Sequence, residues 1–274
     1  MLPRKRLSRG LGRVASTATG RRVVQRAVDV YVRAYDVDLS DAILPPGGFR
    51  TFDEFFTRAL VPGARPVAGG DRTLVSPADG KVEAAGPVDS RASIRVKGRE
   101  YSVDELLGED GSRFEGGRFA IVYLSPRDYH RVHAPARGVV HTVRHVGGTL
   151  LPVNSFGLEA YPNLFARNER VVVFTRGDEG EVVTILVGAI GVGRISVSFD
   201  PSVMTNVGRG PTTVRYPAES GPTVERGDEL GMFHLGSTAI VITAPEVGAE
   251  LSVAPGQVVR MGCELAVARA GEAP

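Results

Sequence analysis

The sequence has few residues of the kinds that cross-link a chain or bind soft metals. It contains one cysteine, Cys263, and no tryptophan among its 274 residues. A single cysteine excludes a disulfide within the chain and every metal site that needs several thiolates. No run of about 18 apolar residues is present, so we expect no helix that crosses a bilayer. The arginine-rich start also lacks the apolar core of a secretory signal peptide.

Negative charge is missing from the beginning of the chain. Residues 1–28 contain no Asp or Glu but eight basic residues: Arg4, Lys5, Arg6, Arg9, Arg13, Arg21, Arg22 and Arg26. The whole chain has a formal net charge of only +2, which argues against a nucleic-acid-binding protein. Such a basic block either contacts an acidic surface or forms a solvated tail. Its composition is also typical of a mitochondrial transit peptide.

Two helices are predicted near the N-terminus. Residues 21–35 have apolar positions on one face and mostly basic positions on the other at helical spacing, which predicts an amphipathic helix about 22 Å long. This helix either packs on its own domain or lies on an anionic membrane, where each Lys or Arg contributes about 1 kcal/mol. Thr51 and Glu54 then form a capping-box pattern before Phe52, Phe55 and Phe56, and Pro62 with Gly63 ends this second helix.

The rest of the chain has the pattern of strands. Abundant glycine and proline favour short strands with tight turns, and six β-branched segments stand out. They are Phe119–Leu124, Val139–Val146, Arg170–Phe174, Val182–Val187, Ile195–Phe199 and Ala239–Thr243. We therefore predict an α+β protein in which a mainly antiparallel β-sandwich body follows N-terminal amphipathic helices.

Three places carry residues for nucleophilic chemistry. Asp79 lies in the turn 75–80, His130 and His133 lie in the segment 123–135, and Ser237 directly follows Gly236. A histidine can take the proton of a serine hydroxyl while an aspartate orients the imidazole. Because glycine permits unusual backbone angles, a serine placed after it is suited to attack the preceding carbonyl, here that of Gly236.

The same histidines allow other arrangements. A helical turn after Pro126 would direct His130 and His133 toward one site, whereas an extended strand would direct them to opposite sides. With Asp79 as a third ligand they would make a metallohydrolase site, although the zinc motif with a glutamate between two histidines is absent. We therefore assign no metal. Asp79 before glycine is, taken alone, typical of a structural turn.

Several motifs in order resemble the phosphatidylserine decarboxylase family, from about Phe52 to the C-terminus. The resemblance rests on Leu235-Gly236-Ser237-Thr238, on Ser76-Pro77-Ala78-Asp79-Gly80 and on Tyr129-His130-Arg131-Val132-His133. It also rests on Phe56-Thr57-Arg58, Pro62 to Pro66, Gly148 to Asn154, Asn168-Glu169-Arg170, Val187-Gly188-Ala189 and Arg226 to Phe233.

This resemblance implies a self-cleaving proenzyme. Asp79, His133 and Ser237 would form the cleavage triad, and the cut between Gly236 and Ser237 would give chains 1–236 and 237–274 that stay associated. Ser237 would become a covalent pyruvoyl group, the only cofactor. That group would form a Schiff base with phosphatidylserine and release CO2 to leave phosphatidylethanolamine, with His130 assisting.

The resemblance also implies a domain organisation, a set of partners and a cellular location. Residues 1–47 would be a basic, membrane-facing segment and residues 48–274 the decarboxylase domain. The partners would be an anionic membrane surface, its phosphatidylserine and further copies of the chain, but no nucleic acid. We expect a peripheral protein on the cytoplasmic face of a bacterial membrane.

Three alternatives stay open at this point. The substrate is either phosphatidylserine, another amino phospholipid or, as in tryptophan-decarboxylating relatives, a soluble amino acid. A non-enzymatic carrier module is suggested by similar hairpin sequences at residues 76–82, 134–140 and 254–259, which are like those of lipoyl domains. That module lacks the modified lysine flanked by methionine, because Lys81 and Lys97 have other neighbours.

Overall fold

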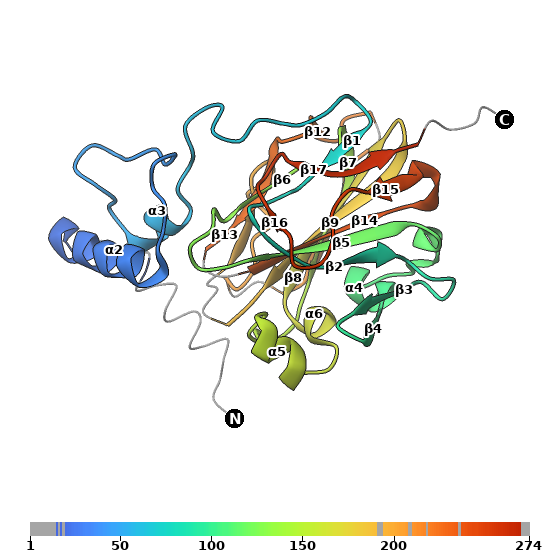
Figure 1. Ribbon diagram of the computed structural model, residues 1–274, viewed down its shortest axis with the longest axis horizontal. Helices are drawn as coiled ribbons and strands as arrows, with labels where there is room; N and C mark the ends of the chain where they lie inside the picture. Colours follow the sequence, from blue (N-terminus) through green and yellow to red (C-terminus); the bar gives the residue numbers. More distant parts are fainter. Residues whose placement is uncertain are drawn as a thin grey trace.

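The computed structural model describes residues 15, 17, 20–190, 194–207, 210–217, 219–234 and 237–269. The basic residues from Arg4 to Arg13 lie outside the described residues. Two helices, α2 (Arg21–Tyr35) and α3 (Phe52–Phe56), stand beside a large β-sheet body (Figure 1). This is the α+β arrangement that the sequence predicts.

Helices α2 and α3 pack on each other through their apolar faces. Val24 and Val28 of α2 are buried in a cluster with Phe49, Phe55 and Phe56. The apolar stripe of α2 is therefore partly used within the protein, in agreement with the packing alternative. Three other apolar residues of the helix (Val23, Val30 and Tyr35) are exposed, together with its arginines.

Helix α3 begins as predicted but is shorter than predicted. Thr51 Oγ1 accepts a hydrogen bond from the backbone N–H of Glu54 at 3.0 Å, and Glu54 accepts one from the N–H of Arg50 at 2.5 Å. The second bond differs from a standard capping box, in which it would come from the cap residue itself. The helix ends at Phe56, well before Pro62, so the predicted end was wrong.

The centre of the body is one large antiparallel sheet. Its strands follow the order β11-β7-β8-β9-β14-β5-β2-β16, and β12 also pairs with β7. The strands are β2 (Gly80–Pro87), β5 (Arg118–Leu124), β7 (Gly138–Val146), β8 (Arg170–Gly177), β9 (Gly180–Gly188), β11 (Thr212–Arg215), β12 (Thr223–Val224), β14 (Ser237–Thr243) and β16 (Val258–Val259). Five of the six strand segments predicted from sequence lie in this sheet, and the sixth forms the shorter strand β10 (Ile195–Val197).

Two three-stranded sheets cover one face of the large sheet. One consists of β1 (Thr73–Val75), β17 (Glu264–Ala268) and β15 (Ala249–Leu251), and the other of β10, β13 (Glu229–Phe233) and β6 (Arg131–His133). Two apolar clusters fill the space between the layers and contain, from the large sheet, Ala239 and Val241 of β14. The predicted antiparallel sandwich is therefore present.

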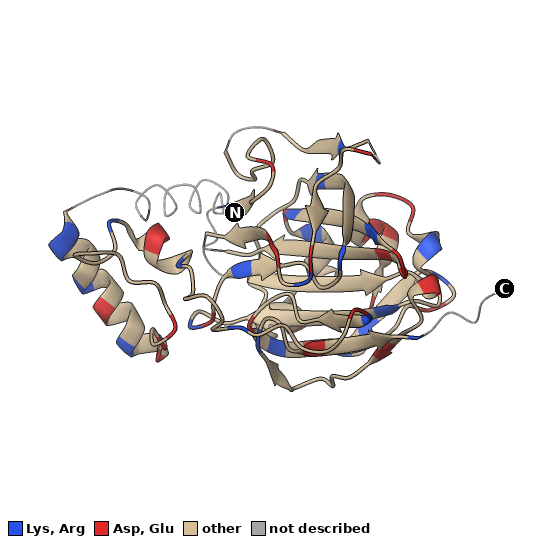
Figure 2. Cartoon of the chain, turned by 90° about the horizontal axis from the view of Figure 1, so that it is seen from above, with Lys and Arg blue, Asp and Glu red and all other residues tan. Residues whose placement is uncertain are grey.

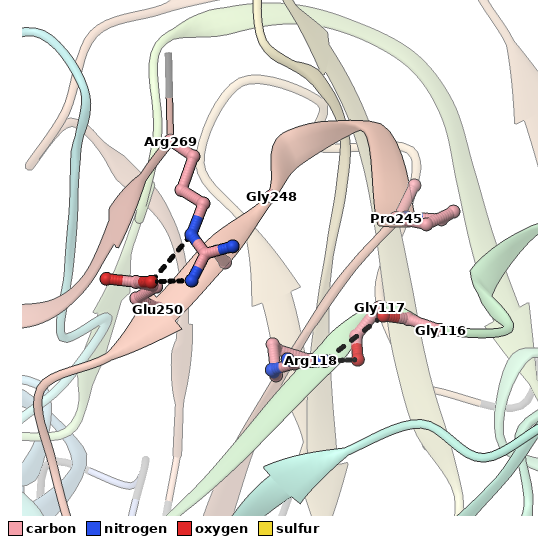
Figure 3. Close-up of a pocket in the computed structure, with 9 residues that line it drawn as sticks. Gly116, Gly117, Arg118, Pro245, Gly248, Glu250 and Arg269 are labelled. Carbon is pink, nitrogen blue, oxygen red and sulfur yellow. Dashed lines mark hydrogen bonds and ion pairs between the residues drawn. The ribbon is translucent and has the colours of Figure 1, made fainter. Parts of the chain in front are cut away.

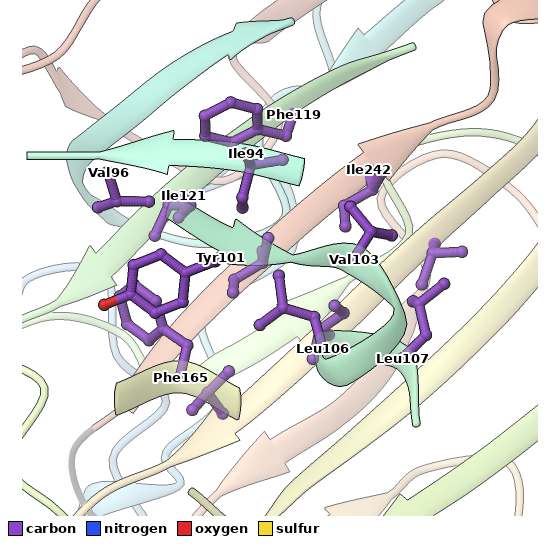
Figure 4. Close-up of a cluster of buried hydrophobic side chains, with 14 of the residues drawn as sticks. Ile94, Val96, Tyr101, Val103, Leu106, Leu107, Phe119, Ile121, Phe165 and Ile242 are labelled. Atoms are coloured by element: carbon purple, nitrogen blue, oxygen red, sulfur yellow. The ribbon is translucent and has the colours of Figure 1, made fainter. Parts of the chain in front are cut away.

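The other face of the large sheet carries a third layer. It contains β3 (Ser93–Val96), β4 (Arg99–Ser102), α4 (Val103–Leu107), α5 (Ser155–Ala160), α6 (Leu164–Arg167) and the short 3-10 turn Ser112–Phe114. A second such turn, Pro245–Val247, follows β14. Ile240 and Ile242 alternate with the sandwich-facing residues and belong to the cluster of this layer. Figure 4 shows Ile242 within it. Strand β14 is consequently buried on both faces along its whole length.

Candidate active site

The sheet topology brings the predicted site residues to one edge. Ser237, the first residue of β14, pairs with Leu124 at the end of β5 and with Gly188 at the end of β9. Strand β2 starts beside the end of β5, where Lys81 pairs with Tyr123. Asp79 directly precedes β2 and is therefore about 10 Å from Ser237, across two strand spacings.

Ser237 is completely buried, and its hydroxyl makes no hydrogen bond within the described part of the chain. A buried hydroxyl without a partner costs roughly 1–3 kcal/mol, and such groups are rare outside functional sites. Leu235 and Gly236 lie outside the described residues, so the expected scissile peptide itself is not described.

His133 is held in a tautomer that leaves a basic nitrogen. Its Nδ1 lies 2.7 Å from the carbonyl oxygen of Gly227, which only accepts hydrogen bonds, so the proton is on Nδ1. Its Nε2 therefore accepts from the hydroxyl of Tyr129, 3.0 Å away. Burial lowers the pKa of His133, so the ring is neutral at pH 7. Tyr129 is a site residue that sequence reasoning missed.

Asp79 is bound by an arginine. Nε of Arg65 lies 3.0 Å from Oδ1 and Nη2 lies 2.7 Å from Oδ2, and the N–H of Met261 donates to Oδ1 at 2.8 Å. Asp79 also stands near His133, because the backbone N–H of His133 donates to the carbonyl of Pro77 at 2.8 Å. Among the described side chains, however, the two share no hydrogen bond. The resemblance had included Arg65 without assigning it a role.

His130 is completely buried against Phe56, and it shares the carbonyl of Asp128 with Arg58. Its ring centroid is 4.0 Å from that of Phe56, and its Nδ1 donates to the carbonyl of Asp128 at 2.7 Å. Its Nε2 is buried and has no partner in the described structure. Complete burial lowers its pKa to about 3, so the ring is neutral.

The chain between the two histidines is extended. Only residues 126–127 form a turn, and His133 belongs to strand β6, so the helical-turn arrangement was wrong. Within the described residues, no three side chains of His, Cys, Asp or Glu are grouped as a metal site would require.

A second Ser-His-Asp arrangement lies next to the expected cut. His234, to which the sequence assigned no role, has Nδ1 2.8 Å from Asp53 and Nε2 3.0 Å from the hydroxyl of Ser196. Arg194 also pairs with Asp53 at 3.1 Å. The cluster therefore joins α3, β10 and the segment that leads to Gly236.

A pocket elsewhere in the protein is unrelated to these residues. It is lined by Gly116, Gly117, Arg118, Ala244, Pro245, Gly248, Ala249, Glu250 and Arg269 (Figure 3). Arg118 pairs with Thr243, at the opposite end of β14 from Ser237. The pocket is thus about 20 Å from the serine at a strand rise of about 3.4 Å per residue.

Fold and site together define an α+β protein with a buried serine, whose hydroxyl has no partner among the described residues, and a buried, neutral histidine. Comparison with known proteins identifies the family. The phosphatidylserine decarboxylase family model matches residues 52–267. The chain is 39% identical to the phosphatidylserine decarboxylase proenzyme of Brevibacillus brevis over 98% of this chain and 96% of that protein. It is also 39% identical to the proenzyme of Shewanella loihica over 96% and 94% of the two chains.

The chain therefore belongs to the phosphatidylserine decarboxylase family, a family of pyruvoyl-dependent carboxy-lyases that are made as proenzymes. Helices long and apolar enough to span a membrane are absent from the described residues.

Proposed function

We propose that this chain cuts itself between Gly236 and Ser237 and then decarboxylates phosphatidylserine. The observation that carries the proposal is the buried hydroxyl of Ser237, which has no described hydrogen-bond partner and lies at the first residue of β14, at the edge of the sheet where Asp79 precedes β2. An unsatisfied nucleophile at a fixed strand end is the arrangement that attack on the preceding carbonyl needs.

His133 is the base in this proposal. Its Nε2 carries a lone pair at neutral pH, and Ser237 must replace Tyr129 as the partner of that atom. The hydroxyl proton moves to Nε2 as the Ser237 oxygen bonds to the Gly236 carbonyl carbon. The imidazolium then returns this proton to the Ser237 nitrogen as the peptide bond breaks, which leaves an ester and a free amine. The negative charge of Asp79 lies close enough to stabilise the imidazolium that forms, and Arg65 fixes its orientation.

The ester then breaks by elimination. Loss of the Ser237 α-proton expels the Gly236 carboxylate and leaves dehydroalanine at position 237. Water converts this residue to a pyruvoyl group and releases ammonia, so the products are chains 1–236 and 237–274. The proposal assigns His133 as the base for this step as well.

The surroundings of position 237 fit a pyruvoyl group. The position is enclosed between β5 and β9, and the neighbouring Thr238 offers a second buried hydroxyl without a described partner. The group supplies an electron-withdrawing carbonyl for the substrate amine. The protein supplies the rigid strand that orients the group and the apolar walls that exclude water.

His130 is proposed to act at the substrate carboxylate. The neutral ring and Phe56 make an apolar environment that favours neutral CO2 over a carboxylate anion. Because its proton is on Nδ1, Nε2 must first gain a proton before His130 can donate one.

The N-terminal segment 1–47 is proposed to face the membrane, with 48–274 as the catalytic domain. On α2 the arginines at positions 21, 22, 26 and 33 are exposed, beside exposed Val23 and Val30. Figure 2 shows basic positions along this helix. Basic and apolar groups on one outer surface suit the interface of an anionic membrane. Assembly into homo-oligomers belongs to the same proposal.

Intact mass spectrometry tests the self-cleavage. The wild type should give two chains, the smaller one lighter by one ammonia than the encoded peptide 237–274, whereas Ser237→Ala should stay whole. Ser202→Ala removes an exposed serine and should be cut like the wild type. A wild-type chain of full mass after purification in the folded state would overturn the proposal.

Decarboxylation of vesicles then tests the substrate. Release of CO2 from phosphatidylserine vesicles, with none from free serine or free tryptophan, is the expected result. Preference for a free amino acid would favour the soluble-substrate alternative.

A further inference from the structure

Arg58 is a buried cation that makes no ion pair among the described residues, although the charge of Asp79 partly opposes the effect of burial on its pKa. It is only 5% exposed, and no carboxylate of the described residues lies within ion-pair distance of it. Its Nη2 approaches two carbonyl oxygens, those of Arg127 at 3.2 Å and Asp128 at 3.3 Å, while its Nε is buried without a described partner. Burial accordingly lowers its pKa. Such a charge destabilises the protein unless an anion meets it.

Arg58 is also adjacent to the proposed decarboxylation site. The carbonyl oxygen of Asp128 accepts hydrogen bonds from both Arg58 and His130. The guanidinium lies over the ring of Phe55, 5.4 Å from its centroid, and the next residue, Phe56, packs on His130. An anion bound by Arg58 would therefore lie beside the imidazole of His130.

The substrate carries two anionic groups, and the chemistry distinguishes them. Pairing the carboxylate with an arginine would stabilise the ground state more than the transition state, because the carboxylate loses its charge as CO2 forms. The phosphodiester keeps its charge throughout the reaction. A guanidinium also matches the geometry of phosphate oxygens.

We propose that Arg58 binds the phosphodiester of the lipid headgroup. This contact would place the carboxylate of the same headgroup against neutral His130. This inference rests on the proposed function, and it assigns a substrate-recognition role to a residue outside the cleavage triad. Arg58, His130 and Ser237 are each buried in the uncut chain, so the proposal requires that the lipid reach Arg58 after cleavage.

The test separates phosphate binding from cleavage and from turnover. Arg58→Gln removes the positive charge, and Arg58→Lys keeps the charge but lacks the planar guanidinium. Arg50→Ala removes an exposed arginine just before α3 and is the control. Cleavage of each is first checked by intact mass. Binding of dihexanoylphosphatidylglycerol, which has a phosphodiester but neither carboxylate nor amine, is then measured by calorimetry below its aggregation concentration. Decarboxylation of dihexanoylphosphatidylserine gives kcat and KM.

Arg58→Gln should be cut, should bind the phosphatidylglycerol roughly 10- to 100-fold more weakly and should raise KM by a similar factor. Its kcat should change little, Arg58→Lys should be intermediate and Arg50→Ala should match the wild type. Unchanged phosphatidylglycerol binding with a reduced kcat would assign Arg58 to the carboxylate and overturn the proposal. If neither Arg58 variant is cut while the wild type is cut, Arg58 has a role in cleavage. This result would also overturn the proposal. An uncut wild type would instead overturn the proposed function.

Discussion

Arg65 donates hydrogen bonds to both carboxylate oxygens of Asp79. The aspartate is therefore a fixed negative charge and not a mobile partner of His133. The two side chains are nearly buried, with about a tenth of each exposed. Removing the arginine leaves a carboxylate that keeps only the N–H of Met261.

We therefore expect Arg65→Ala to lower both stability and cleavage. The loss in unfolding free energy should be about 1–3 kcal/mol, since one partner of a mostly buried pair is left alone. Denaturant unfolding in a Ser237→Ala background measures this without cleavage, and Arg72→Ala, exposed on the body, is the control. A variant as stable as its parent would show that Asp79 needs no counter-charge.

Tyr129→Phe should accelerate cleavage. The Tyr129 hydroxyl occupies Nε2 of His133, the atom that Ser237 has to reach. Removal of one competing hydrogen bond should raise the rate of cutting roughly 3- to 10-fold. The rate of cleavage is measured on freshly translated chain by gel electrophoresis of samples taken over time. Tyr123→Phe is the control. A slower Tyr129→Phe would mean that the hydroxyl positions the ring.

Stability should fall in mild acid because His130 is buried as a neutral ring. Its pKa is about 3 when folded and ordinarily near 6.5, so the unfolded chain binds the extra proton between these values. The contribution of neutral His130 to the free energy of unfolding is fully present above pH ~6.5. Below that pH it decreases by at most about 1.4 kcal/mol per pH unit. The lowered pKa of His133 acts in the same direction.

Unfolding measured from pH 4 to pH 7 for Ser237→Ala and for Ser237→Ala/His130→Gln checks this prediction. The free energy of unfolding of the double variant should change less with pH than that of Ser237→Ala. Equal slopes in the two proteins would exclude His130 as a source of the acid sensitivity.

Asp53→Asn and His234→Ala should each slow cleavage, by roughly tenfold for one lost charge-assisted hydrogen bond. The pair fixes the segment two residues before Gly236, so the double variant should be no slower than the slower single variant. The rate of cutting is compared with that of Asp36→Asn, an exposed aspartate after α2. Additive effects would mean that the two residues act independently.

Much of the fold was predictable because strand patterns are local. The six β-branched segments were found within a few residues, since alternation and flanking turns need no knowledge of partners. The end of α3 was wrong because five residues suffice to bury Phe55 and Phe56, whereas the next proline comes much later.

The members of the candidate site could be proposed from the sequence, but their contacts could not. Ser237, His133 and Asp79 were proposed from the resemblance to the family, because a Gly-Ser-Thr turn and an Asp before glycine are, taken alone, ordinary structural features. The bonds of Asp79 to Arg65 and of His133 to Tyr129 depend on the tertiary fold. His234 pairs with an aspartate 181 positions earlier in the chain, which no local pattern signals.

Strand β14 lies between β9 and β5 in the middle of the large sheet, and a cut before Ser237 would make it the first element of a separate chain. The strands β15, β16 and β17 of that same piece pair with one another and with β1 and β2 of the other. Cleavage would thus turn one polypeptide into two chains of unequal length that share a single core, neither of which contains all strands of the large sheet. The melting temperature of the mature protein should then rise with its concentration, like that of an obligate heterodimer, whereas that of the uncut chain should not.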